Sequence, residues 1–293
     1  MKRKPGRGKP PREETTVLYE IGRSSPADAD GEEDAGARVR RPRRPRLEEI
    51  RREDGWIAVS KPAGVPSVRE RWNTEAPTAL SLLHGEFRRK DPGAPLPFVI
   101  HRIDKETSGL LLFGRDEETS RTISEAFRRR RVRKEYLALV IGSPPEPAGE
   151  IELRLLADPR RKPAMRVVRH RGKRSTTAWE TEETFRSHTL LHVRPRSGRT
   201  HQIRVTLAHI GCPVLADPLY GGGGGLYLSA LKPGYRAPRD HPERPLLGRL
   251  ALHAHRLAFD LGEGDALRTV ALEAPLPKDF RVSLERLRQY AAS

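Results

Sequence analysis

The chain has 293 residues, enough for one large domain or two modest ones with a sizeable core. Its 56 Lys and Arg against 39 Asp and Glu leave a net charge of +17, which favours nucleic acid as a partner. The sequence shows no signal peptide, lipidation signal or membrane-spanning apolar run, and its single cysteine, Cys212, excludes an internal disulfide. We therefore expect a soluble cytoplasmic protein that does not engage a membrane.

The first 46 residues are poor in large apolar side chains and carry their charge in blocks. An acidic patch from Asp28 to Asp34 precedes six arginines between Arg38 and Arg46. Such a segment cannot bury enough surface to offset the entropy of ordering it. We predict a disordered basic tail over residues 1–46 and one folded domain over residues 47–293. The arginine run alone does not separate a role in attracting RNA from a role in solubility.

The folded part predicts short strands with few helices between them. A strand at Trp56 to Val59 runs into the turn Lys61 to Gly64, and the clearest helix runs from Glu117 to Arg130, with Asp116 as its N-cap and Ile123 and Phe127 on one face. Further strands are predicted at Leu110 to Phe113, Tyr136 to Ile141, Thr176 to Thr181, Thr189 to Arg194 and Val270 to Leu272. The helices are too few for a doubly wound parallel sheet. We predict an α+β fold with a mixed, mainly antiparallel sheet flanked by helices and loops, and with a central cleft.

A polar segment from His101 to Gly109 leads directly into the apolar strand at Leu110 to Phe113. A turn that feeds a buried strand can present one carboxylate, that of Asp104, at the floor of a cleft. The alternative is that Asp104 caps the turn through Thr107 or Ser108, as an arbitrary aspartate in such a turn would do.

Two further segments carry candidate site residues. Arg199 and Arg204 lie five residues apart near a glycine turn, where they can bind phosphates or one of them can meet a carboxylate across a cleft; a solvated turn is the alternative. Tyr136 lies in a strand whose alternation places it on one face with Ala138 and Val140, and taken alone it is as well explained as a core aromatic.

Together these segments resemble one family, the RluA-type RNA pseudouridine synthases of ribosomal and transfer RNA. The resemblance covers residues 54–290 in the order and spacing of that family. Its motifs are Lys61-Pro62-Ala63-Gly64, His101 to Gly109, Lys134 with Tyr136, Gly198 to Arg204, Leu252-His253-Ala254 and Ala274-Pro275-Leu276-Pro277. Agreement of that extent does not arise by chance, although each motif alone would be a hypothesis.

The resemblance implies a role for three side chains. Asp104 is the catalytic aspartate, Tyr136 stacks on the target base, and Arg204 pairs with Asp104. Converting uridine to pseudouridine moves the ribose bond from a ring nitrogen to a ring carbon with no gain or loss of atoms, so no cofactor is required. The sequence departs from the family pattern at Thr206 and Cys212, where histidine is common, and at Ala216, where glycine usually precedes the aspartate.

The segment from Arg160 to Arg174 is predicted to form a β-hairpin with a basic tip. Eight basic residues lie within fifteen positions without an acidic neighbour, which favours phosphate contact over a merely solvated hairpin. The candidate RNA-binding residues are Arg102, Arg160, Arg161, Lys162, Arg171, Lys173 and Arg174. Residues 221–225 and 232–249 are predicted to form a long mobile surface loop. A monomer is expected.

Two other functions compete with this reading. His201, His253 and His255 suggest a metal enzyme, but no pair has the helical spacing of a metal-binding motif, so no metal is expected. A non-catalytic RNA-binding or ribosome-assembly factor could retain the fold and lose the chemistry. The intact Asp104, Tyr136 and Arg204 argue against that alternative.

Overall fold

The computed structural model describes residues 45–69, 76–236, 241–262, 264 and 267–292. In this part of the chain eleven strands form one sheet with the order β1-β2-β4-β10-β5-β9-β8-β6-β7, while β3 pairs with β4 and β11 pairs with β10. Only the pairing of β4 with β10 is parallel among the described strands. The predicted α+β class with a mixed, mainly antiparallel sheet is therefore confirmed. The tail predicted at residues 1–46 lies, as far as residue 44, outside the described residues.

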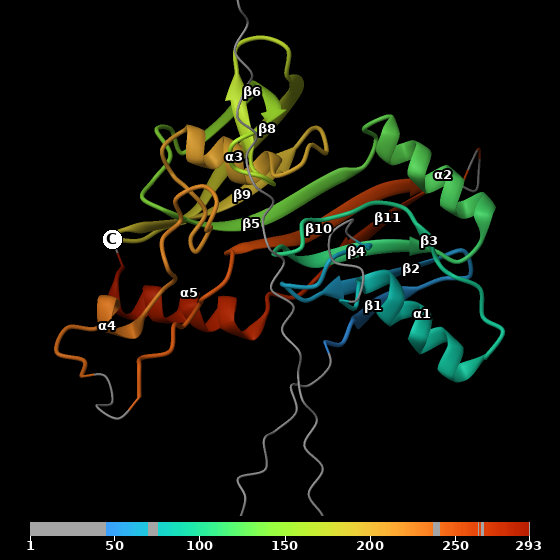
Figure 1. Ribbon diagram of the computed structural model, residues 1–293, viewed down its shortest axis with the longest axis horizontal. Coiled ribbons are helices and arrows are strands. Elements are labelled where there is room, and N and C mark those ends of the chain that lie inside the picture. The colour runs from blue at the N-terminus through green and yellow to red at the C-terminus, as the bar shows by residue number, and fades with distance from the viewer. Residues whose placement is uncertain (1–44, 70–75, 237–240, 263, 265–266, 293) are drawn as a thin grey trace, which may run out of the picture. The chain divides into compact units, whose positions relative to one another are not determined.

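The elements have the following bounds (Figure 1). The strands are β1 Glu48–Arg52, β2 Trp56–Lys61, β3 Phe98–Val99, β4 Ser108–Gly114, β5 Arg133–Ile141, β6 Ala148–Ala157, β7 Met165–Val168, β8 Lys173–Thr184, β9 His188–Pro195, β10 Leu252–Leu261 and β11 Arg268–Glu273. The helices are α1 Ala79–Lys90, α2 Glu117–Arg128, α3 Gln202–His209, α4 Leu228–Leu231 and α5 Lys278–Tyr290.

Strands β2 and β4 are buried on both faces, which is why their sequences read as continuous apolar runs. On one face, Ile57 of β2 and Phe113 of β4 pack against α1. On the other, Trp56 and Leu112 pack against α2 and the facing residues of β10 and β11. A buried strand flanked by two layers holds the loop that precedes it in a fixed position, and the loop that precedes β4 carries Asp104.

Helix α2 begins where the sequence predicts, because the Asp116 carboxylate accepts a 2.8 Å hydrogen bond from the backbone N–H of Thr119. It ends two residues earlier than predicted. Arg130 adopts a φ of 60°, in the left-handed region, and the backbone N–H of Arg131 bonds back to the carbonyl of Ala126 at 2.9 Å. This is the hydrogen-bond pattern that ends many helices, with arginine at the position where glycine is usual.

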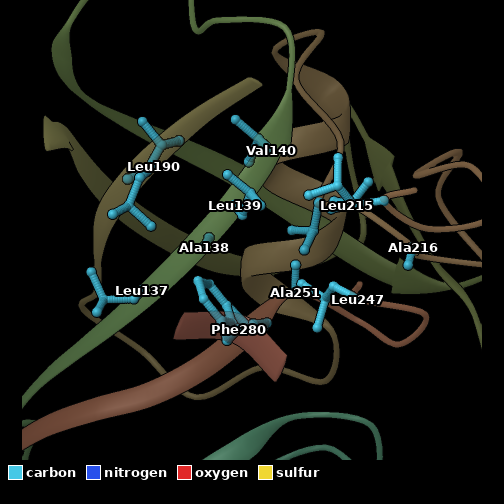
Figure 2. Close-up of a cluster of buried hydrophobic side chains, with 14 of the residues drawn as sticks. Leu137, Ala138, Leu139, Val140, Leu190, Leu215, Ala216, Leu247, Ala251 and Phe280 are labelled. Atoms are coloured by element: carbon cyan, nitrogen blue, oxygen red, sulfur yellow. The ribbon is translucent and has the colours of Figure 1, made fainter. Parts of the chain in front are cut away.

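A further apolar core, separate from the two clusters around β2 and β4, lies between β5, β9 and α5 and also contains residues after α3 (Figure 2). Figure 2 shows Leu139 of β5, Leu215 and Phe280 of α5 pointing into this cluster. Leu247 is fully buried in the same cluster, and Gly222 is buried as well. The prediction of a surface loop over residues 221–225 and 232–249 was therefore wrong at Gly222 and Leu247, because tertiary packing covers them. Residues 237–240 of the predicted loop lie outside the described residues.

Candidate active site

A cavity of about 1210 Å³ opens where the loop before β4, the end of α2, strand β5 and the start of α3 meet. Asp104, Tyr136 and Arg204 all line it, although they lie far apart in the sequence. The basic side chains on its wall are Arg69, Arg102, Lys105, Arg128, Arg130, Lys134, Arg196, Arg199 and Arg204. Among the described residues, the acidic side chains on the wall are Asp104 and Glu106. The cavity therefore favours an anionic ligand.

The loop that carries Asp104 is fixed on both sides of that residue. On one side, the Ser67 hydroxyl donates to the Ile103 carbonyl at 2.8 Å and accepts from the Ile103 N–H at 3.2 Å. On the other, the Lys105 carbonyl accepts hydrogen bonds from the Lys61 ammonium at 3.0 Å and from the Gly64 N–H at 2.9 Å. The backbone of Asp104 is thereby held in place without use of its carboxylate.

Lys61 is a fully buried cation beneath this loop. Its three ammonium donors bond to the carbonyls of Pro62, Val65 and Lys105 at 3.0, 2.7 and 3.0 Å. Burial lowers the pKa of Lys61 to about 7, against the attraction of Glu106 and Asp104. The Lys61 to Gly64 motif is therefore a support for the Asp104 loop.

The Asp104 carboxylate does not cap its own turn. Only its backbone carbonyl bonds to Thr107, at 3.1 Å from the Thr107 N–H, and the side chain is 28% exposed to the cavity. Its ion-pair partner among the described residues is the guanidinium of Arg204, whose Nη1 lies 3.9 Å from Oδ2. The carboxylate is therefore available to a ligand in the cavity.

Arg204 contacts a second carboxylate more closely. Its Nε and Nη2 donate to the two oxygens of Asp217, each at 2.7 Å, and both residues are almost fully buried. This bidentate pair fixes the guanidinium plane. The family resemblance implied the partnership with Asp104, whereas the fully buried Asp217 was missed. It lies thirteen positions from Arg204, and no sequence pattern links the two.

A tight turn presents Asp217 to Arg204. Ala216 has a φ of 56°, in the left-handed region, and its N–H bonds to the Gly222 carbonyl at 2.5 Å. A side chain on Gly222 would collide with the backbone of Val214 and Asp217. The left-handed geometry explains why the family usually has glycine where this chain has alanine.

Tyr136 lies on the cavity face of β5 and packs against both apolar cores. Burial, with added repulsion from Asp104, raises the pKa of the Tyr136 phenol, so the ring stays neutral at any physiological pH. A neutral ring beside the carboxylate offers a flat apolar surface to a base.

Tyr220 connects the Arg204 site to the basic segment that follows β6. Its ring lies 5.3 Å from the Arg204 guanidinium carbon. Its hydroxyl bonds to Nδ1 of His201 at 3.0 Å and accepts from the Met165 N–H at 2.7 Å. Nearby, Nη2 of Arg161 donates to the Leu219 carbonyl at 2.8 Å. The β6–β7 turn is therefore attached to the wall of the cavity.

The basic segment is not a hairpin with a single charged tip. Strands β6 and β7 form a hairpin whose turn, residues 158–164, carries Arg160, Arg161 and Lys162. The chain then crosses β6 to reach β8 on the other side of that strand. Gly172 permits the crossing, because a side chain at this position would collide with the backbone of Arg154 and Leu155. The prediction of a single basic tip was wrong, because the basic residues are divided between the β6–β7 turn and the segment that leads across β6 into β8.

The predicted RNA-binding residues differ in their contacts. Arg102 is exposed on the cavity wall. Arg160, Lys162, Arg171 and Lys173 have exposed side chains. Arg174 has an acidic neighbour in space, because its Nε lies 3.6 Å from the Glu152 carboxylate on β6.

The three histidines considered as metal ligands have other partners. His201 bonds to Tyr220, as described above. Rings of His253 and His255 both approach the Ala274 carbonyl, at 3.2 and 3.0 Å, and His253 also bonds to Ser108 at 3.0 Å. These contacts join β10 to β4 and to the segment before α5.

The fold, with a basic cavity beside its central strands, is that of the pseudouridine synthases. A family model described as RNA pseudouridylate synthase matches residues 55–209. The chain is 34% identical over 244 residues to the ribosomal large subunit pseudouridine synthase D of Xanthomonas campestris, covering 82% of this chain and 69% of that protein. It is 30% identical over 219 residues to the dual-specificity RNA pseudouridine synthase RluA of Pasteurella multocida, covering 74% and 89%.

A solved structure of human RNA pseudouridylate synthase domain containing 4 is similar in fold, with a TM-score of 0.62 at 23% identity over 82% of this chain and 93% of that one. This chain therefore belongs to the RNA pseudouridylate synthase family, in its RluA-type branch, whose members are isomerases that act on RNA. None of the described helices is long and apolar enough to cross a membrane.

Proposed function

We propose that this protein converts uridines of ribosomal or transfer RNA to pseudouridine, with Asp104 as the catalytic residue, Tyr136 as the platform for the base and Arg204 as the cationic partner of Asp104. The observation that carries the proposal is the Asp104 carboxylate, which faces the basic cavity from a loop fixed on both sides by Ser67 and Lys61. The names of the relatives, which refer to the ribosomal large subunit and to dual RNA specificity, support the choice of substrates.

The reaction asks little of the enzyme beyond a carboxylate and a pocket. The bond from the ribose carbon to ring nitrogen 1 breaks, the uracil turns, and the same ribose carbon bonds to ring carbon 5. A proton leaves carbon 5 and one is taken up at nitrogen 1, so the composition is unchanged and no cofactor is needed. An ionised carboxylate beside the sugar serves either as a nucleophile or as a base towards the ribose. A target base flipped out of its stack is held by an aromatic ring such as Tyr136.

RNA is held by the basic residues around this site. Arg102 lies on the cavity wall, and Arg160, Arg161 and Lys162 lie on the turn attached to that wall. Arg171 lies in the segment that crosses β6, and Lys173 and Arg174 begin β8 after it. The charge of +17 supports action on RNA, and the single cysteine is typical of a reducing compartment such as the cytoplasm. We infer that the protein acts as a monomer.

The test compares pseudouridine positions across all cellular RNA between wild-type cells, cells that lack the gene, and cells complemented with Asp104→Asn. We expect the sites lost with the gene to stay unmodified in the Asp104→Asn strain. The matched control is Asp91→Asn, which removes an exposed carboxylate at the end of α1 and should restore every site. Purified Asp104→Asn protein should still fold and bind RNA. Restoration of any site by Asp104→Asn would refute the assignment, and retention of all sites in the deletion strain would refute the function.

A further inference from the structure

Lys134 and Tyr136 lie two residues apart on β5, so their side chains point to the same face of the sheet. Lys134 and Tyr136 both line the cavity, whereas Arg133, the residue before Lys134 on β5, is not among the residues that line it. Alternation along a strand places successive Cα atoms of one face about 6.7 Å apart.

The Lys134 ammonium is held in place and has donors left for a ligand. It donates one hydrogen bond, to the Ser197 carbonyl at 2.8 Å, while an ammonium has three donors. Neither Lys134 nor Arg130 has an ion pair with a carboxylate of the described residues. Arg130 lies on the same cavity wall and lowers the pKa of Lys134 by its charge. Two cations therefore line the cavity without a salt-bridge partner among the described residues.

The backbone at Arg130 adds a second observation. Its φ of 60° places a bulky residue in the left-handed region, which L-residues with a side chain seldom adopt. Glycine would satisfy the end of α2 without that strain. Strain of this kind is found where a side chain is needed for a function, and here the side chain of Arg130 reaches the cavity wall.

The surroundings of Lys134 set how its charge responds to pH. Burial, and then the charge of Arg130, lowers the pKa of Lys134 to about 8. His101 also faces Lys134, and burial lowers the pKa of His101 to about 3, so that imidazole is neutral. The carboxylates of the same cavity are those of Asp104 and Glu106. A phosphate bound beside Lys134 and Arg130 would compensate their positive charge, which no carboxylate of the described residues pairs with.

We propose that Lys134 and Arg130 form a subsite for one phosphodiester of the RNA, the phosphate that adjoins the uridine stacked on Tyr136. This deepens the proposed function and rests on it. The subsite fixes the position of the backbone relative to the base platform, because Lys134 and Tyr136 project from one strand. It is distinct from the basic turn at residues 158–164, which is attached to the cavity lining through the carbonyl of Leu219.

The first test measures how RNA affinity depends on salt, with an RNA hairpin that carries one uridine in its loop as the probe. All proteins carry Asp104→Asn, so that turnover does not complicate binding. Loss of one phosphate contact lowers the slope of log affinity against log salt by about 0.7 to 0.9. We expect that loss for Lys134→Met, with roughly tenfold weaker binding at low salt. Arg133→Met removes an equal charge from the other face of β5 and should leave the slope unchanged. Equal changes in both variants would overturn the subsite.

The second test separates a phosphate contact from a merely structural role. Between about pH 7 and pH 9, wild-type affinity should fall toward that of Lys134→Met, while Lys134→Arg, whose charge persists, should retain its affinity. A hairpin with a neutral methylphosphonate next to the loop uridine should bind the wild-type protein roughly tenfold more weakly and Lys134→Met no more weakly than the unmodified hairpin. Additive losses would overturn the proposal. These outcomes concern binding alone, so they stay distinguishable from a failure of isomerisation in the cellular test.

Discussion

Arg204 forms ion pairs with the carboxylates of Asp104 and Asp217, which differ in how deeply they are buried. Asp217 is fully buried and bound by two hydrogen bonds, whereas Asp104 is 28% exposed and 3.9 Å away. Removal of one partner of a buried ion pair leaves the other charge without compensation and costs about 3 to 5 kcal/mol. Substitution of Arg204 therefore disturbs the fold as well as the site.

We predict that Arg204→Met lowers the free energy of unfolding by about 3 to 5 kcal/mol, because it strands the Asp217 carboxylate in the core. Asp104→Asn should change it by less than about 1 kcal/mol, since the buried Arg204 keeps both hydrogen bonds to Asp217. Urea unfolding of both variants measures the difference. If the double variant Arg204→Met with Asp217→Asn recovers none of the lost stability, the stranded charge is not the cause.

The Tyr136 ring is predicted to act through its flat face. Tyr136→Phe keeps the ring, so we expect single-turnover isomerisation within a few-fold of wild type. Tyr136→Leu keeps apolar bulk but removes the aromatic face, and stacking on a base contributes about 1 to 3 kcal/mol. The leucine variant should therefore bind and react roughly 5- to 150-fold less well. Equal rates for the two variants would show that Tyr136 is not the platform.

At the scale of the elements, the sequence predicted strands best where both faces are buried or the alternation is regular. The predicted run Leu110 to Phe113 lies inside β4, and the predicted run Thr189 to Arg194 lies inside β9. The order of the strands could not be read in the same way. Strand β10 lies between β4 and β5, and the Ser108 to His253 contact joins residues 145 positions apart. Such pairings depend on packing of the whole domain.

The sequence likewise predicted some residues of the candidate site and missed others. Motif resemblance predicted Asp104, Tyr136 and Arg204 as site residues, and all three line one cavity, which leaves their roles as a prediction. It did not reveal Asp217 as the closer partner of Arg204, or Ser67 as a support for Ile103, because those partners come from other turns of the chain. Arg161 was predicted to contact RNA but also bonds to the Leu219 carbonyl, which only the folded chain brings near.

The β6–β7 turn and the crossing after β7 are predicted to act differently on RNA. Arg160→Gln with Lys162→Gln changes the turn that is attached to the cavity wall, so we expect the single-turnover rate at saturating enzyme to fall roughly tenfold. Arg171→Gln with Lys173→Gln removes the same charge from the crossing segment and the start of β8. That pair should weaken affinity and lower the salt slope by up to about 1.8 while sparing the rate. The opposite division of effects would contradict this assignment.

For the molecule as a whole, most of the positive charge belongs to the folded domain. The first 44 residues contain 12 Lys and Arg against 8 Asp and Glu, a net charge of +4 out of the +17 of the chain. The remaining +13 lies in residues 45–293. Electrostatic attraction of RNA therefore comes mainly from the domain that holds the cavity.

The stability of the domain should depend on pH through His253, which joins β10 to β4 and is fully buried. Burial lowers the pKa of His253 from 6.5 to about 4; the nearby His255 and Arg249 lower it further, while the Ala274 carbonyl and Asp279 oppose the shift. Above about pH 6.5 this imidazole is neutral in both folded and unfolded states and contributes nothing. Below it, the unfolded chain takes up a proton that the folded domain excludes. The free energy of unfolding should then fall by up to about 1.4 kcal/mol per pH unit until about pH 4.

The measurement takes the difference in unfolding free energy between wild type and His253→Gln across a pH series, so that groups common to both proteins cancel. Glutamine can still donate to the Ala274 carbonyl and does not titrate. We expect the difference to be constant above about pH 6.5 and to shift in favour of the variant between about pH 6.5 and pH 4. His241→Gln replaces an exposed histidine and should give a flat difference throughout. A flat difference for His253→Gln as well would mean that the folded domain accommodates the charged imidazole, and that its burial does not set the acid limit of the fold.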